Sequence, residues 1–153
     1  MPGFHLAEIN IARLLAPLDH PQIADFVADL APVNALADRS DGFVWRLVGE
    51  AGNAIDLSYS EDPFIIVNMS VWTTPEALRN FVYRSGHIEV FRKRAHWFEP
   101  HTQAPYCLWW VPAGHIPSLA EGRDRLNHYH LHGPTAHSFW FTDLHPAPAL
   151  ASV

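Results

Sequence analysis

The sequence has a single cysteine, Cys107, and only ten Lys and Arg residues among 153. One cysteine excludes an intrachain disulfide and a cysteine zinc cluster. Its apolar surroundings, YCLWWV, predict a small buried side chain. The few basic residues form no stripe and the net charge is −6, which argues against nucleic acid as a partner. No apolar run approaches the length of a membrane span and no leader pattern is present, so we expect a soluble cytoplasmic protein without a membrane partner.

Aromatic side chains, by contrast, are abundant, with six Trp and nine Phe. Buried Trp needs a partner for its indole N–H, and aromatic side chains are typical of pockets and interfaces. The length predicts one domain over residues 5–142, followed by a flexible tail over residues 143–153.

Hydrophobic periodicity predicts four main strands, at residues 5–15, 43–49, 64–72 and 104–112. Helices are expected at residues 18–30, 75–85, 87–98 and 119–132. Pro32 should end or kink the first helix, and Ser118 with Glu121 forms a capping box for the last. SFWF, at 138–141, is expected to be a short edge strand.

The expected order is therefore β-α-β-β-α-β, with an appended C-terminal helix and short strand. This order predicts an α+β protein with a ferredoxin-like antiparallel sheet and both main helices on one face. The apolar row Ile65, Val67, Met69 and Val71 suits packing on those helices, because alternate residues of a strand share a face.

The opposite face is then left open. It carries Glu8, Phe64, Ile66, one of Trp109 or Trp110, and Arg46, which lies opposite the row Phe43, Trp45 and Leu47. An exposed face with incidental polar residues is the simpler interpretation. The apolar side chains among these polar groups favour a pocket for a hydrophobic small molecule. The residues expected to contact that molecule are Asn10, Arg46, Asn68, Ser70, Trp72, Tyr83 and Trp110.

Five segments, LAEINIARL, GFVWRL, VNMSVW, FVYRSGH and LWWVPAGHIP, resemble an uncharacterised bacterial family of the dimeric α/β-barrel superfamily. That superfamily includes antibiotic-biosynthesis monooxygenase-like proteins, and the resemblance covers residues 5–142. It implies a homodimer in which two ferredoxin-like sheets form a barrel, and the partner would cover the open face. Its members include cofactor-free monooxygenases, haem-binding proteins and small cyclases, so the fold does not select the chemistry.

His87 follows a helix break at Ser85–Gly86, where a ring can approach a cavity or a planar ligand closely. We expect His87 to act as a general base and Arg84 to bind an anionic group, both as catalytic residues. A histidine that only hydrogen-bonds at the kink, and an arginine that pairs with a nearby acid, are the alternatives. The leading hypothesis is a monooxygenase-like enzyme that needs no cofactor and acts on a hydrophobic or aromatic metabolite. The rivals are a haem protein with His87 as the axial ligand and a non-catalytic binding protein.

The stretch LNHYHLHGPTAH carries four histidines. His128 and His132 are four residues apart and share a helix face, whereas His130 points away. His137 lies beyond the predicted end of the helix and would have to fold back, which gives at most a partial metal site. We therefore expect no metal there, since favourable interaction with the helix dipole explains histidines in a last turn.

Overall fold

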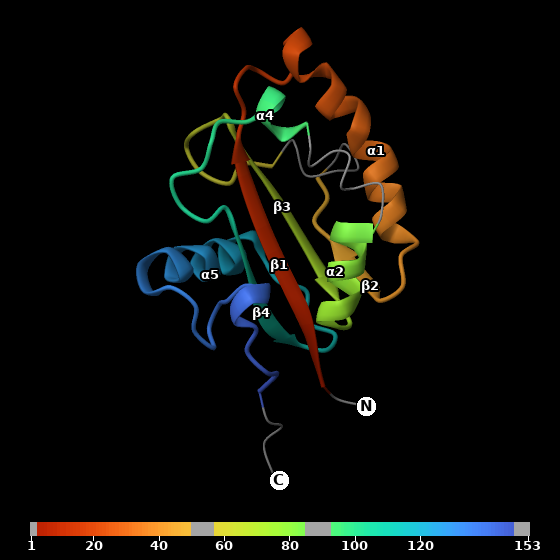
Figure 1. Cartoon of the computed structure of the whole chain (residues 1–153), viewed down its shortest axis with the longest axis vertical. Helices are drawn as coiled ribbons and strands as arrows, with labels where there is room; N and C mark the ends of the chain where they lie inside the picture. The colour runs from red at the N-terminus through yellow and green to blue at the C-terminus, as the bar shows by residue number, and fades with distance from the viewer. Residues whose placement is uncertain (1–2, 50–56, 85–92, 149–153) are drawn as a thin grey trace.

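The computed structural model describes residues 3–49, 57–84 and 93–148. The protein has an α+β fold, a four-stranded antiparallel sheet with helices packed on it (Figure 1). The strands are β1 (Phe4–Arg13), β2 (Phe43–Arg46), β3 (Ile65–Trp72) and β4 (Tyr106–Pro112), in the order β2-β3-β1-β4. The helices are η1 (Pro21–Ile23), α1 (Ala24–Asp38), α2 (Pro75–Arg84), α4 (Arg94–Trp97), α5 (Leu119–His132) and η2 (Phe141–Asp143).

The register places β1 between two antiparallel partners. Glu8 lies opposite Ser70 of β3 and Leu108 of β4. Two residues further along, Asn10 lies opposite Asn68 and Tyr106. Because opposed residues in an antiparallel pair share a face, these side chains all project to one side of the sheet, which we call the Glu8 face.

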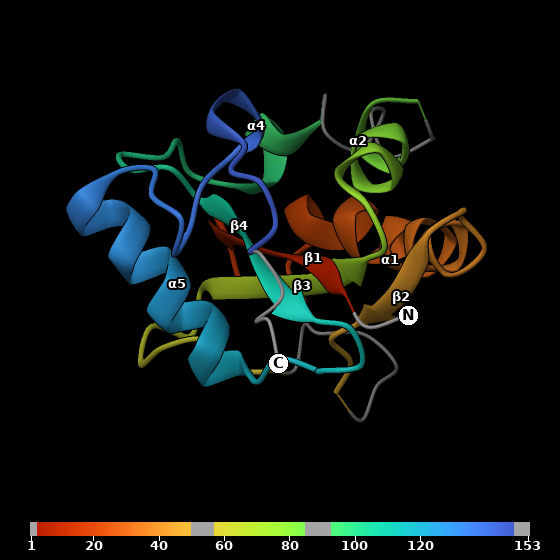
Figure 2. The same cartoon turned by 90° about the horizontal axis from the view of Figure 1, so that it is seen from below.

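The helices cover both faces of the sheet, but not in the predicted way. On the opposite face, Ile9, Met69 and Trp109 are fully buried in a cluster that includes Leu126 of α5. The Glu8 face packs against α1, α2 and α4 (Figure 2). The prediction that the row of Val67, Met69 and Val71 packs on the main helices is therefore wrong, since the appended helix α5 covers it.

Chain direction explains this reversal. The strands β1 and β2 run parallel to each other, and so do β3 and β4, because each pair is separated by one antiparallel neighbour. Connections between parallel strands of one sheet are almost always right-handed, which fixes the face on which α1 and α2 lie. The hydrophobicity of a strand row carries no information about that handedness.

The structure also corrects several element boundaries. The helix α1 continues through Pro32 to Asp38, because Ala31 and Pro32 lie on its exposed side and the continuation buries Ala37. In β2, a bulge between Phe43 and Trp45 places Phe43 on the face of Trp72, so Phe43, Trp45 and Leu47 do not form one row.

Two of the shorter elements also differ from prediction. Of the predicted helix at 87–98, the described part forms only the single turn α4, and residues 85–92 lie outside the described residues. The predicted edge strand at 138–141 is reduced to one bridge, in which Phe139 pairs with Leu108 of β4. Among the described residues, no helix combines the length and apolarity needed to cross a membrane.

Candidate functional site

The Glu8 face carries two hydrophobic clusters separated by polar side chains. One cluster contains Trp72 with side chains of α1 and α2, and the other contains Trp97 with side chains of η1 and α1. Between them lie Glu8, Asn10, Asn68 and Ser70. The helices bury the two clusters, because apolar surface gains most from leaving water.

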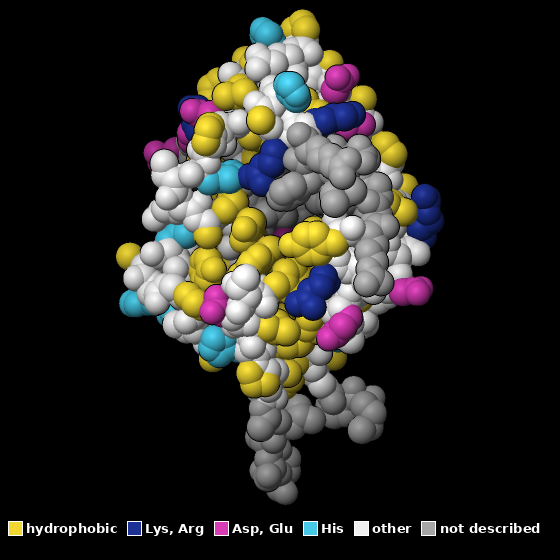
Figure 3. Space-filling model, viewed as in Figure 1, with side chains coloured by type: hydrophobic (Ala, Val, Ile, Leu, Met, Phe, Trp, Pro, Cys, Tyr) yellow, Lys and Arg dark blue, Asp and Glu magenta, His cyan; other side chains and the backbone are white. Residues whose placement is uncertain are grey.

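The polar centre of this face is open to solvent at one end. Asn10 is exposed although it lies on β1, which has a strand on each side. Figure 3 shows hydrophobic side chains gathered in the lower middle of this surface. An interior strand carrying an exposed polar residue therefore marks the floor of a recess.

Glu8 is buried two residues before Asn10 on β1 and is hydrogen-bonded on both oxygens. The Ser70 hydroxyl donates to Oε1 over 2.7 Å, and the Asn10 amide donates to Oε2 over 2.9 Å. The Trp72 indole N–H donates to the Ser70 hydroxyl over 2.9 Å. Each partner is therefore oriented by the next, and the chain of bonds runs from the hydrophobic cluster to the carboxyl group.

Burial gives Glu8 unusual acid–base properties. Desolvation raises the pKa of its carboxyl group from 4.5 to about 7, against the opposing effect of the hydrogen bonds from Asn10 and Ser70. A group with a pKa near neutrality is present in both protonation states at neutral pH, so it can accept a proton and return it. Strongly shifted carboxyl groups in a recess are candidates for catalysis.

Aromatic side chains border the recess on the β4 side. Tyr106, the β4 neighbour of Asn10, stacks on Trp140 with 3.8 Å between ring centroids. On the side of α2, Phe81 stacks on Trp72 at 5.2 Å. The site thus combines a buried carboxyl group and two amides with flat apolar walls, an arrangement that suits a hydrophobic ring with a polar substituent.

Four of the residues predicted to contact a ligand lie together at this site: Asn10, Asn68, Ser70 and Trp72. Trp110 is on the same face, opposite Trp109 as predicted, but its indole N–H donates to the carbonyl of His145 at the far end of the sheet.

The other predicted residues are elsewhere. Arg46 forms a bidentate ion pair with Asp38 of α1, at 2.8 and 3.3 Å, which is the alternative interpretation of this arginine. Tyr83 is exposed on α2, and Arg84 ends that helix. His87 lies outside the described residues, so its predicted role stays a prediction.

Sequence reasoning did not single out Glu8 as a candidate acid–base group, nor the Tyr106–Trp140 pair. Glu8 carried a usable signal, because an acidic residue inside an apolar strand, in register with Asn10, is unusual. Trp140 carried none, since its contact with Tyr106 joins segments that are distant in the sequence.

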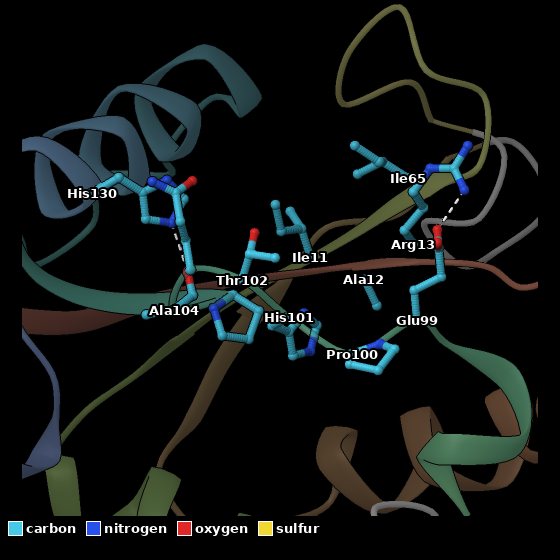
Figure 4. A pocket seen from close by; sticks show the side chains of 12 residues that line it. Ile11, Ala12, Arg13, Ile65, Glu99, Pro100, His101, Thr102, Ala104 and His130 are labelled. Atoms are coloured by element: carbon cyan, nitrogen blue, oxygen red, sulfur yellow. Dashed lines mark hydrogen bonds and ion pairs between the residues drawn. The ribbon is translucent and has the colours of Figure 1, made fainter.

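A separate pocket of about 250 Å³ lies beside the end of β1 and the start of β3, where residues 99–105 lead into β4 (Figure 4). Three of the side chains that line it already have partners. Arg13 pairs with Glu99, and the His130 ring is hydrogen-bonded to the backbone carbonyl of Ala104 over 2.6 Å. Glu8 does not line this pocket, and we take Glu8, a buried titratable group beside the exposed Asn10, as the candidate site.

The histidine-rich segment folds back on α5. The ring of His128 lies 4.4 Å from that of His132 and 4.3 Å from that of His137, while His130 points to the other side, as predicted. Within the described ranges, no group of three or more His, Cys, Asp or Glu residues is placed to hold a metal ion.

Comparison with known protein families identifies the family of this chain. A family described as a domain of unknown function, DUF3291, matches residues 5–153. The chain belongs to the DUF3291 family. No curated protein matches it. Among solved structures, the DUF3291 chain is similar to the NE2512 protein of unknown function from Nitrosomonas europaea, with 14% identity, a TM-score of 0.48, and coverage of 75% of this chain and 96% of that one.

Proposed function

We propose that this protein is a small enzyme that binds a hydrophobic or aromatic metabolite in the recess of the Glu8 face and transfers a proton through Glu8. The observation that carries the proposal is the buried carboxyl group of Glu8, whose pKa burial raises to about 7, two residues along β1 from the exposed side chain of Asn10. Glu8 takes the role of general base that the sequence assigned to His87.

The surroundings of Glu8 support this role. The Asn10 amide donates to the carboxylate and is itself exposed, so a ligand oxygen that reaches the recess meets a polar group beside the base. Asn68, its cross-strand neighbour, is half-buried on the same face. Burial keeps the carboxylate poorly solvated, which makes it a stronger base.

A generic base probe tests the proposal without knowledge of the natural substrate. In 5-nitrobenzisoxazole, a base removes the ring proton, the N–O bond breaks, and a coloured cyanonitrophenolate forms. We expect the protein to accelerate this elimination above the buffer rate, with an activity that rises with pH through an inflection near 7, where Glu8 ionises. The rate is obtained from the absorbance of the phenolate, recorded over time at several pH values.

Glu8→Gln is the decisive variant, because it keeps the shape of the side chain and removes the base. Glu61→Gln is the matched control, since Glu61 is exposed in the segment before β3. We expect Glu8→Gln to lose the acceleration and Glu61→Gln to retain it. Equal rates for Glu8→Gln and the unaltered protein would show that Glu8 is not the base. Saturable binding of the probe with no turnover would support a non-catalytic binding protein.

The finer architecture is also a proposal. The strand order and the placement of α1 and α2 support a ferredoxin-like sheet, and the resemblance extends this to a monooxygenase-like dimeric barrel that uses dioxygen. The face that an open sheet would offer to a partner is covered by α5, so the homodimer needs a different interface. Analytical ultracentrifugation tests whether the protein is a homodimer, and a monomer at micromolar concentration would contradict that proposal. Localisation in the cytoplasm stays a prediction.

The haem alternative has its own test. Protein reconstituted with haemin should show a Soret band that His87→Ala abolishes if His87 is the axial ligand. A band that persists unchanged in the variant contradicts that assignment.

A further inference from the structure

The segment after α5 crosses the Glu8 face as a strap, which we define as residues 133–143. Phe139 pairs with Leu108 at the outer edge of β4 through two backbone hydrogen bonds of 2.7 and 2.9 Å. Trp140 then stacks on Tyr106. The guanidinium of Arg79 from α2 lies over the ring of Phe141 in a cation–π contact, 4.9 Å from the ring centroid. The strap therefore connects α5 to α2 and carries Trp140, one wall of the recess.

The start of the strap is attached to α5 by His137. The imidazole Nε2 of His137 bonds to the carboxylate of Asp124 over 3.0 Å, and its carbonyl accepts a 2.8 Å bond from Arg125. The Ser138 hydroxyl donates to the carbonyl of Arg125 over 2.8 Å. These bonds place the His137 ring on the helix face that carries His128 and His132.

The three rings are in contact, but their charges would not be balanced. His128 lies between His132 and His137, and its Nδ1 atom is buried without a hydrogen-bond partner in the described part of the chain. Of the ionic groups that act on it, Asp124 raises its pKa and Arg125 lowers it. Protonation of all three rings would leave up to three added positive charges in contact, and Asp124 is the carboxylate that the described residues place beside them.

We propose that this histidine cluster is a pH-sensitive latch that holds the strap closed at neutral pH and releases it at acid pH. Release moves His137 away from His128 and withdraws Trp140 from Tyr106, so the recess loses its wall on the β4 side. The latch thereby regulates ligand binding at the Glu8 site, and in this respect it rests on the function proposed above.

The direction of the effect follows from the contacts of His128. Desolvation, together with repulsion from His137 and His132, lowers the pKa of His128 below its usual 6.5 in the closed arrangement. The open arrangement takes up the proton more readily, so closure is stable above about pH 6.5 and is lost as the pH falls below it. The pairing of His137 with Asp124 opposes release, but one carboxylate compensates one charge only.

Hydrogen–deuterium exchange tests the latch without any ligand. We expect strap amides, including those of Thr135, His137 and Phe139, to exchange severalfold faster at pH 5.5 than at pH 7.5 after correction for the intrinsic rate, because protonation of His128 favours the open strap. The double variant His128→Gln, His132→Gln should lose this increase. His96→Gln, an exposed histidine of α4, is the matched control and should retain it.

A second variant secures the result if the double variant does not fold. Asp124→Asn removes the compensating charge, so the strap should open at a higher pH than in the unaltered protein. An unchanged opening pH in this variant, opening that persists in the double variant, or exchange that does not depend on pH in the unaltered protein would each overturn the proposal. Glu8→Gln should open its strap normally, which separates failure of the latch from failure of the proposed function.

Discussion

The carboxyl group of Glu8 on β1 accepts a 2.7 Å hydrogen bond from the hydroxyl of Ser70, its cross-strand neighbour on β3. Both side chains are more than nine-tenths buried, on a sheet face otherwise packed with hydrophobic clusters. A buried carboxyl group carries a desolvation cost whenever it is ionised, and a few hydrogen bonds reduce that cost without removing it. The hydrogen bond from Ser70 therefore bears directly on the pKa of Glu8.

Ser70→Ala should raise the pKa of Glu8 further above its value of about 7, because the lost hydrogen bond stabilises the ionised form. The carboxyl carbon of Glu8, followed by NMR during a pH titration and assigned with Glu8→Gln, reports this shift. Ser40→Ala, which removes a hydroxyl bonded to the carbonyl of Leu36, is the control and should leave the titration unchanged. A Glu8 pKa in Ser70→Ala that equals or lies below the unaltered value would contradict the assignment.

Glu8 should also make the protein less stable as the pH rises. Its carboxyl group has a pKa of about 7 when folded and about 4.5 when unfolded, so the folded state binds more protons between these values. Stability from this group is complete below pH 4.5 and is lost as the pH rises through 7. Glu8→Gln, measured by urea denaturation, should gain up to about 3 kcal/mol relative to the unaltered protein between pH 4 and pH 8. A constant difference across that range would contradict the raised pKa.

Period-2 alternation was sufficient to predict much of the sheet and part of the site. It placed Asn10, Asn68, Ser70 and Trp72 on one face, because the spacing of side chains along a strand is fixed by backbone geometry. It could not say which face the helices cover, since that depends on crossover handedness.

Two further features were beyond the reach of local patterns. The bulge in β2, which turns Phe43 onto the face of Trp72, is a defect in pairing that the alternation of residues conceals. The Tyr106–Trp140 contact depends on the path of the strap after α5, so it becomes visible only in three dimensions. The pKa of Glu8 depends in turn on the burial that these tertiary contacts produce.

Cys107 should be unreactive in the native protein. Its side chain is fully buried on the α5 side of β4, and burial raises the pKa of the thiol, which suppresses the reactive thiolate. An Ellman assay at pH 8 should detect no thiol in the folded protein and one thiol per chain in denaturant. A native reaction as fast as that of a small free thiol would show that β4 is accessible at this position.

Gly42 and Gly114 both have positive φ angles, of 81° and 92°, but their surroundings differ. A Cβ atom at Gly42 would lie 2.5 Å from the Cβ of Ala77 in α2, whereas one at Gly114 would have no neighbour within 4 Å. Both alanine variants incur the cost of a left-handed backbone, and Gly42→Ala must in addition displace α2 from the start of β2.

Gly42→Ala should therefore lower the free energy of unfolding by about 1–3 kcal/mol more than Gly114→Ala does, which is the usual range for overpacking. Urea denaturation of the two variants under one set of conditions measures the difference, and the shared backbone cost cancels between them. Because Thr73 donates its N–H to the carbonyl of Gly42 over 2.8 Å, a shift at this turn also moves the end of β3 that carries Trp72. Equal losses in the two variants would show that α2 is free to move away from the turn.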